Sequence, residues 1–278
     1  AIAILFIAHF FAGVYGLAFI GSLVALLVSL EGKNLLFSNQ ERFNKVFFLL
    51  VNFVVFICVG FGSIIQSFIQ SNLQNSIQIQ GQQWQTYVFA FACVLIFALA
   101  MIQNQRFADL DGLFSFQTKA LFGLFYLGVL PGLVVQILFL KDGLQWFIAM
   151  LMIVFFGDTA AYLVGTLVGK KKLMPRVSPK KSIEGSIGGL GGSMIAAIML
   201  SWLFLPEVDL TFLVLLSVSM GLFAQMGDLF ESMLKRVANV KDSGGVMPGH
   251  GGLLDRIDGV LFAAPILHLG LSILKIQT

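Results

Sequence analysis

Long apolar stretches, separated by short polar segments, run along almost the whole chain. Seven of them cover roughly 45–69, 84–103, 120–140, 144–168, 186–205, 211–230 and 258–275. Each is close to the roughly 20 apolar residues that an α-helix needs to cross a bilayer. An eighth stretch fills residues 1–30, where Gly13 and Gly16 can break one span into a re-entrant pair. The pattern predicts an all-α, polytopic integral membrane protein with eight or nine transmembrane helices.

Composition supports this fold class. Of the 278 residues, 58% are hydrophobic and only 11% are charged, and the mean hydropathy is +0.93. Soluble domains carry about 25% charged residues, and disordered chains carry low hydrophobicity, so both classes are excluded. Cys58 and Cys93 lie inside apolar stretches, which favours small packed side chains over a disulfide or a metal pair.

Basic residues alternate between the two sides of the predicted membrane. If the apolar stretches cross in turn, 15 of the 17 Lys and Arg residues fall on one side. The positive-inside rule assigns that side to the cytoplasm. Two long polar loops, 169–185 and 231–257, then both face the cytoplasm. We divide the chain into N-terminal spans (1–119) without recognised chemistry and a C-terminal region (120–278) that holds the candidate site.

Two aspartates lie where aspartates are costly. Asp158 and Asp228 are inside apolar stretches, and a carboxylate near the centre of a membrane helix costs about 2.5–3.5 kcal/mol. On a helix, Asp228, Glu231, Ser232 and Lys235 share one face. This predicts a functional, polar helix face at the membrane boundary. Asp158 either hydrogen-bonds between helices or lines a cavity, and its role is open.

A glycine-rich segment, 241–252, follows this face and leads into the last span. It cannot be a helix interior, and its amide groups can approach phosphate oxygens closely. Asp255 and Asp258 come next, at i and i+3. Their return to the membrane surface after Asp228 fits hard-oxygen ligands, because Mg²⁺ typically takes one or two carboxylates together with substrate phosphates.

The loop 169–185 carries six basic residues within twelve positions. They can anchor the topology against anionic lipid, or the Ser-Pro-Lys-Lys-Ser core and Glu184 can form an ordered phosphate pocket. Gly185, Gly188, Gly189 and Gly192 follow in small-xxx-small spacing, which predicts close helix packing.

Together these motifs resemble the signature of phosphatidate cytidylyltransferases, also called CDP-diacylglycerol synthases. The run from Ser232 to Asp258 carries most of the resemblance, and Gly227-Asp228 and the segment 176–185 extend it. It covers roughly 155–265. Met247 stands where Leu, Ile or Phe is expected, and Ser182 where Thr is common; neither is expected to be a metal or phosphate ligand.

The resemblance implies that CTP and phosphatidate give CDP-diacylglycerol and pyrophosphate in the cytoplasmic leaflet of a bacterial-type inner membrane. It implies Mg²⁺ or Mn²⁺ held by Asp228 and Asp255, with Asp258 close by, and a second cation is left open. The expected partners are CTP, phosphatidate and membrane lipid. Nucleic acid is not expected, and a homodimer is left open.

Several further residues are candidates for catalysis or for binding substrate phosphate. Lys235 is a catalytic candidate beside the three aspartates. His250 suits ordering the loop or donating to phosphate, with proton transfer as the alternative. The expected phosphate-binding residues are Arg176, Ser178, Lys180, Lys181, Ser232, Arg236, Lys241, His250 and Arg256. The alternatives are a CTP-dependent lipid kinase, which would release CDP, and an ion-coupled transporter, which would show inverted repeats.

Overall fold

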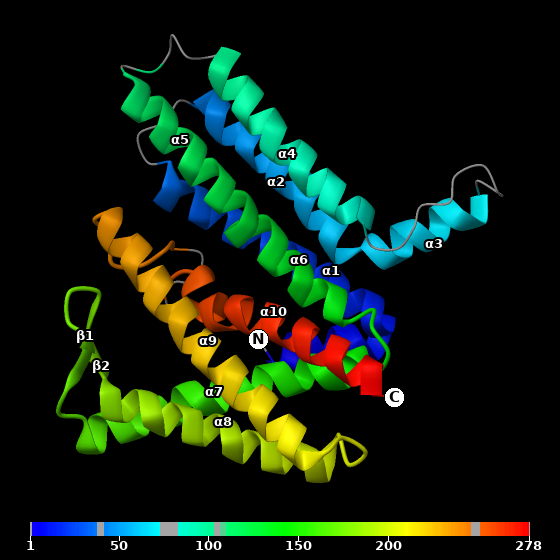
Figure 1. The fold of residues 1–278 in the computed structure, drawn as a ribbon, viewed down its shortest axis with the longest axis vertical. Coiled ribbons are helices and arrows are strands. Elements are labelled where there is room, and N and C mark those ends of the chain that lie inside the picture. The colour runs from blue at the N-terminus through cyan, green and yellow to red at the C-terminus, as the bar shows by residue number, and fades with distance from the viewer. Residues whose placement is uncertain are drawn as a thin grey trace. The chain divides into compact units, whose positions relative to one another are not determined.

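The computed structural model describes residues 2–37, 42–72, 83–102, 107, 109–245 and 251–277. The chain divides into two compact units, residues 1–139 and 140–278. Nearly all of the described residues are helical, and the short antiparallel pair β1 (Lys172–Met174) and β2 (Ser178–Ser182) is the exception (Figure 1). The predicted all-α class is confirmed.

The N-terminal unit consists of helices that cover an apolar core. Their bounds are α1 (Ile2–Leu36), α2 (Arg42–Gly60), α3 (Gly62–Asn72), α4 (Gln83–Ile102), α5 (Leu110–Gly123), the π-helical turn η2 (Leu124–Val129) and α6 (Leu130–Ile137). Gly13 interrupts α1 with a positive φ of 56°, which glycine tolerates readily because it has no Cβ.

The C-terminal unit is a bundle of four long helices. They are α7 (Gly143–Val168), α8 (Ile183–Leu203), α9 (Leu210–Val237) and α10 (Leu254–Gln277). Consecutive helices run in opposite directions, so the end of α7, the β1–β2 hairpin, the start of α8, the end of α9 and the start of α10 share one end of the bundle (Figure 1). The two long polar loops of this unit therefore meet.

Glycines let α7 and α8 approach closely, as the small-xxx-small spacing predicts. A Cβ built on Gly185 would lie 2.8 Å from the carbonyl oxygen of Ala161, and one on Gly192 would lie 2.7 Å from that of Phe156. Real Cβ atoms do not approach a backbone oxygen so closely, so larger residues here would push the helices apart. This contact fixes the cavity wall that α7 forms.

Within the described residues, seven helices are long and apolar enough to cross a membrane. An eighth span is obtained if the bent pair Asn44–Gly60 and Gly62–Ser71, which meet at 73°, counts as one. The sequence predicts eight or nine spans, so the described residues agree with the lower number when this pair is counted as one span. The described spans agree with the predicted stretches, although Leu110–Ile137 begins ten residues earlier than 120–140.

Candidate active site

A cavity of about 840 Å³ opens at the end of the C-terminal bundle where its two polar loops meet. This volume falls in the range of small-molecule sites. All four helices and the hairpin contribute to it. Its lining residues are Phe155, Asp158, Thr159, Ala161, Tyr162, Gly165, Thr166, Lys172, Leu173, Lys180, Lys181, Ser182, Gly185, Ser186, Gln225, Asp228, Leu229, Asp255, Arg256 and Asp258.

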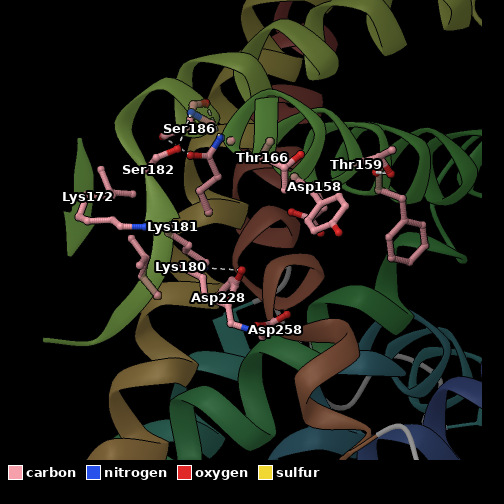
Figure 2. A pocket seen from close by; sticks show the side chains of 18 of the residues that line it. Asp158, Thr159, Thr166, Lys172, Lys180, Lys181, Ser182, Ser186, Asp228 and Asp258 are labelled. Carbon is pink, nitrogen blue, oxygen red and sulfur yellow. Dashed lines mark hydrogen bonds and ion pairs between the residues drawn. The ribbon is translucent and has the colours of Figure 1, made fainter. Parts of the chain in front are cut away.

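The β1–β2 hairpin supplies the basic wall of the cavity. Lys172, Lys180 and Lys181 line it from the hairpin side (Figure 2). The Glu184 carboxylate accepts hydrogen bonds from the backbone amides of Lys170 (3.1 Å) and Lys171 (3.2 Å), which closes the base of the hairpin. The loop 169–185 is thus an ordered element, as the phosphate-pocket interpretation requires.

Two further contacts attach the hairpin to the helices. The Ser182 side chain caps α8 by accepting a hydrogen bond from the amide of Gly185 (3.1 Å). Arg236, at the end of α9, donates from Nε to the carbonyl oxygen of Val177 (3.3 Å). The hairpin lysines are therefore held against α9.

Four aspartates from three helices line the cavity, namely Asp158, Asp228, Asp255 and Asp258. Asp228 on α9 forms an ion pair with Lys181 (Figure 2). Asp258 on α10 is 8% exposed, and its Oδ1 accepts a hydrogen bond from the amide of Gly259 (2.8 Å). Asp158 on α7 interacts electrostatically with Asp228 and Lys181. Carboxylates and ammonium groups thus share one cavity, as expected of a site for phosphates and cations.

Behind the cavity, Lys235 joins α9 to the start of α10. Its Nζ lies 2.5 Å from Glu231 Oε2 and 2.6 Å from Asp255 Oδ1. The Glu231 side chain is only 1% exposed. Asp255 Oδ2 accepts hydrogen bonds from the amides of Ser243 (3.2 Å) and Gly252 (2.8 Å). Asp255 therefore organises both ends of the glycine-rich segment, and both of its oxygens are engaged.

A polar pair joins α8 to α9 at the cavity wall. The Ser186 hydroxyl donates to Gln225 Oε1, and Gln225 Nε2 donates back to the carbonyl oxygen of Ser186 (3.0 Å). Because each group satisfies the other, this pair holds α9, and with it Asp228, in a fixed register against α8.

The structure brings together part of the predicted site. Asp228, Asp255, Asp258, Lys180, Lys181 and Arg256 all line the cavity. The lining found among the described residues does not include Arg176, Ser178, Ser232, Lys235, Arg236 or Lys241. Of these, Lys235 and Arg236 contact other parts of the protein, as described above. His250 lies outside the described residues.

Other lining residues had weaker signals in the sequence. Gln225 lies three positions before Asp228, so the helical repeat places it on the same face. Phe155, Thr159, Tyr162 and Thr166 follow an i, i+4, i+7, i+11 pattern along α7. In a uniformly apolar helix such a pattern does not stand out until its neighbours are known.

The fold and this cavity define a polytopic helical membrane protein with a charged site at one end of its helices. The chain belongs to the cytidylyltransferase family, whose sequence profile matches residues 1–274.

Curated relatives named phosphatidate cytidylyltransferase include proteins of three Staphylococcus species. That of Staphylococcus haemolyticus (strain JCSC1435) is 37% identical over 175 residues, and that of Staphylococcus aureus (strain COL) is 38% identical over 177 residues. Each match covers 63% of this chain and 65% of the relative. That of Staphylococcus epidermidis (strain ATCC 12228 / FDA PCI 1200) is 35% identical over 184 residues, 66% of each chain. The chain thus matches slightly less than two thirds of the length of these relatives.

Proposed function

We propose that the chain is a phosphatidate cytidylyltransferase, which converts CTP and phosphatidate into CDP-diacylglycerol and pyrophosphate. The observation that carries this proposal is the cavity that brings lysines of the hairpin together with four helix-borne aspartates at the end of membrane-spanning helices. Family membership and the names of the relatives support the same reaction. The concentration of basic residues on one side of the spans supports a cytoplasmic site in an inner membrane.

The reaction joins two anions. A phosphatidate oxygen attacks the α-phosphorus of CTP, a new P–O bond forms, and the bond to the bridging oxygen of pyrophosphate breaks. A phosphomonoester has a second pKa of about 6 and is largely dianionic near neutral pH, so no strong general base is required. The barrier is therefore one of alignment and charge.

Side chains of the cavity would lower that barrier. Lys172, Lys180 and Lys181 line one wall and Arg256 lines the cavity from α10, so cationic groups surround bound phosphates. Ser182, fixed as the cap of α8, and the paired Gln225 keep the helices that carry these groups in register. This arrangement can hold the two substrates in line while it reduces their mutual repulsion.

The aspartates fit a divalent cation by their chemistry. Asp158, Asp228 and Asp258 offer the hard oxygen donors that Mg²⁺ or Mn²⁺ prefers, within one cavity. When bound, such an ion supplies positive charge to the transferring phosphoryl group and to the departing pyrophosphate. Among the described residues, no three acidic, histidine or cysteine side chains already converge on one ion position.

The two aspartates expected to hold the metal differ in their contacts. Asp228 has a partly exposed carboxylate whose partner is a lysine in the same cavity. Asp255 already binds Lys235 and two backbone amides. We propose Asp228 as the principal ligand, with Asp158 and Asp258 as its neighbours in the cavity. Asp255 coordinates only if an oxygen is shared with Lys235, and a second cation stays a prediction.

The proposal is tested with purified protein, labelled CTP and phosphatidate, with Mg²⁺ and with a chelator in its place. We expect CDP-diacylglycerol and pyrophosphate in equal amounts, and loss of turnover with the chelator. Release of CDP with a newly phosphorylated lipid would instead identify a lipid kinase and overturn the proposal.

Asp228→Asn should lower kcat/KM by about 100-fold or more, because it removes the carboxylate proposed to hold the divalent cation, whose positive charge acts on the transferring phosphoryl group. Asp209→Asn is the matched control. Asp209 caps the opposite end of α9 by accepting from the amide of Phe212 (2.8 Å), and asparagine caps helices equally well. A near-normal rate in Asp228→Asn at ordinary Mg²⁺ concentrations would refute the assignment.

A further inference from the structure

The cavity has a second wall whose chemistry differs from that of the hairpin. On α7, Phe155, Thr159, Tyr162 and Thr166 line the cavity at i, i+4, i+7 and i+11, which places them on one helix face. Figure 2 shows Thr159 on the side of the cavity away from Lys172. We call the four residues the α7 stripe.

The α7 stripe presents a largely apolar surface to the cavity. The hydroxyl of Thr159 donates to the carbonyl oxygen of Phe155 (2.7 Å), and that of Thr166 donates to that of Leu163 (2.9 Å). Because these hydroxyls are satisfied by the helix itself, they contribute little hydrogen bonding to a ligand. Phe155 and Tyr162 are 48% and 70% exposed. Asp158 is the charged group on this side, and it interacts with Asp228.

The length and direction of the α7 stripe match one leaflet of a membrane. Thr166 lies near the end of α7, beside the basic hairpin, and Phe155 lies eleven residues deeper. At 1.5 Å per residue the stripe extends about 16 Å along the helix, close to half of the roughly 30 Å hydrocarbon core. A hydrocarbon chain lying along this stripe would run from the phosphate-binding end towards the middle of the bilayer.

An amphiphile with a phosphate at one end fits both walls at once. Its anionic head complements Lys172, Lys180 and Lys181, and its hydrocarbon chain covers exposed Tyr162 and Phe155. We propose that the α7 stripe is the acyl-chain subsite of a phosphate-headed diacyl lipid, so that the protein recognises the hydrocarbon part of its lipid substrate as well as the phosphate. This inference rests on the proposed function.

The first test compares two phosphatidates that share a head group. In Tyr162→Ala and Phe155→Ala, kcat/KM for dioleoyl phosphatidate relative to dihexanoyl phosphatidate should fall about five-fold or more, because the long chain loses apolar contact. The KM for CTP should change less than about two-fold. Tyr87→Ala is the matched control, since Tyr87 on α4 is a tyrosine of similar exposure (67%) outside this cavity. An unchanged chain-length ratio in both stripe variants would overturn the inference.

The second test does not depend on turnover. Purified protein in lipid vesicles is irradiated with a phosphatidate that carries a diazirine in its acyl chain, and with a phosphatidylcholine that carries the same chain. Phosphatidate should label the segment 155–166 several-fold more than phosphatidylcholine does, whereas α4 should be labelled equally by both. Equal labelling of 155–166 would overturn the inference.

The two tests separate the inference from the proposed function. Selective labelling of 155–166 in a protein that makes no CDP-lipid would support the lipid subsite and refute the cytidylyltransferase activity. A change in the oligomeric state of Tyr162→Ala without a change in the chain-length ratio would identify the α7 stripe as an interface between two copies, and the inference would be wrong.

Discussion

At the scale of single residues, Lys235 makes a contact that its local motif does not reveal. The sequence places Lys235 one helical turn after Glu231, on the polar face of α9 that also carries Asp228. In the structure, Asp255, 20 residues further along the chain, completes a cluster of two carboxylates around one ammonium group. The basic group thus stabilises the start of α10 and the glycine-rich segment.

Lys235→Met should destabilise the protein strongly, by about 3–5 kcal/mol, because it leaves the buried Glu231 carboxylate without its partner. The apparent melting temperature in detergent, measured by intrinsic fluorescence, should fall. Adding Glu231→Gln should recover part of the loss, since the buried charge is then removed. A melting temperature of Lys235→Met equal to that of the unmodified protein would contradict this role.

The lysines of the hairpin can be tested as a pair. Lys180→Ala combined with Lys181→Ala should lower kcat/KM for CTP or phosphatidate about ten-fold or more, because charge-assisted hydrogen bonds to phosphate contribute about 1.5–3 kcal/mol each. Lys170→Ala with Lys171→Ala is the matched control. These neighbours contact Glu184 through backbone amides and do not belong to the cavity lining found among the described residues. Equal losses of kcat/KM in both double variants would show that the loop 169–185 acts only as a topology anchor.

At the scale of elements, the cavity depends on how closely α7 and α8 pack. At Gly185 and Gly192 of α8, a Cβ would also meet backbone oxygens of α7, at Ala161 and Phe156, and a backbone oxygen cannot move aside as a flexible side chain can. The position of Asp158 and of the α7 stripe relative to Ser186 and Gln225 follows from this contact.

Gly192→Ala and Gly191→Ala should have opposite effects, although the two positions are adjacent. A methyl group on Gly192 meets the carbonyl oxygen of Phe156 at 2.7 Å, whereas one on Gly191 has no neighbour within 4 Å. Gly192→Ala should lower the apparent melting temperature, and Gly191→Ala should leave it unchanged or raise it, since alanine favours helix by about 1 kcal/mol. Similar shifts in both variants would show that the helices are not in tight contact.

At the scale of the molecule, the spans and the functional end of the bundle could be predicted, because burying charge in a membrane is costly. Asp228 stood out in its apolar stretch for that reason, and the structure gives it a charged partner in the cavity. The partner itself could not be predicted, since Lys181 is 47 positions away and belongs to another element. Thr159 and Thr166 were missed because their spacing does not stand out in a uniformly apolar helix.

The predicted orientation has a direct test in the C-terminal unit. In a background with Cys58→Ser and Cys93→Ser, Met174→Cys in the hairpin and Glu207→Cys before α9 place single thiols at opposite ends of α8, both at exposed positions. A membrane-impermeant maleimide should label the first only in inside-out vesicles and the second only in right-side-out vesicles. The reverse pattern would put the cavity on the external face.

The ion pair between Lys181 and Asp228 has a consequence for the order in which ligands enter. In the proposed function, a phosphate that draws Lys181 away from Asp228 leaves that carboxylate to the cation, and a cation bound to Asp228 leaves Lys181 to the phosphate. Whichever of the two ligands binds first, phosphate or cation, therefore frees the side chain that the other ligand needs. If the proposed divalent ion and nucleotide both bind there, thermodynamic reciprocity requires that the ion tighten nucleotide binding by the same factor by which the nucleotide tightens ion binding.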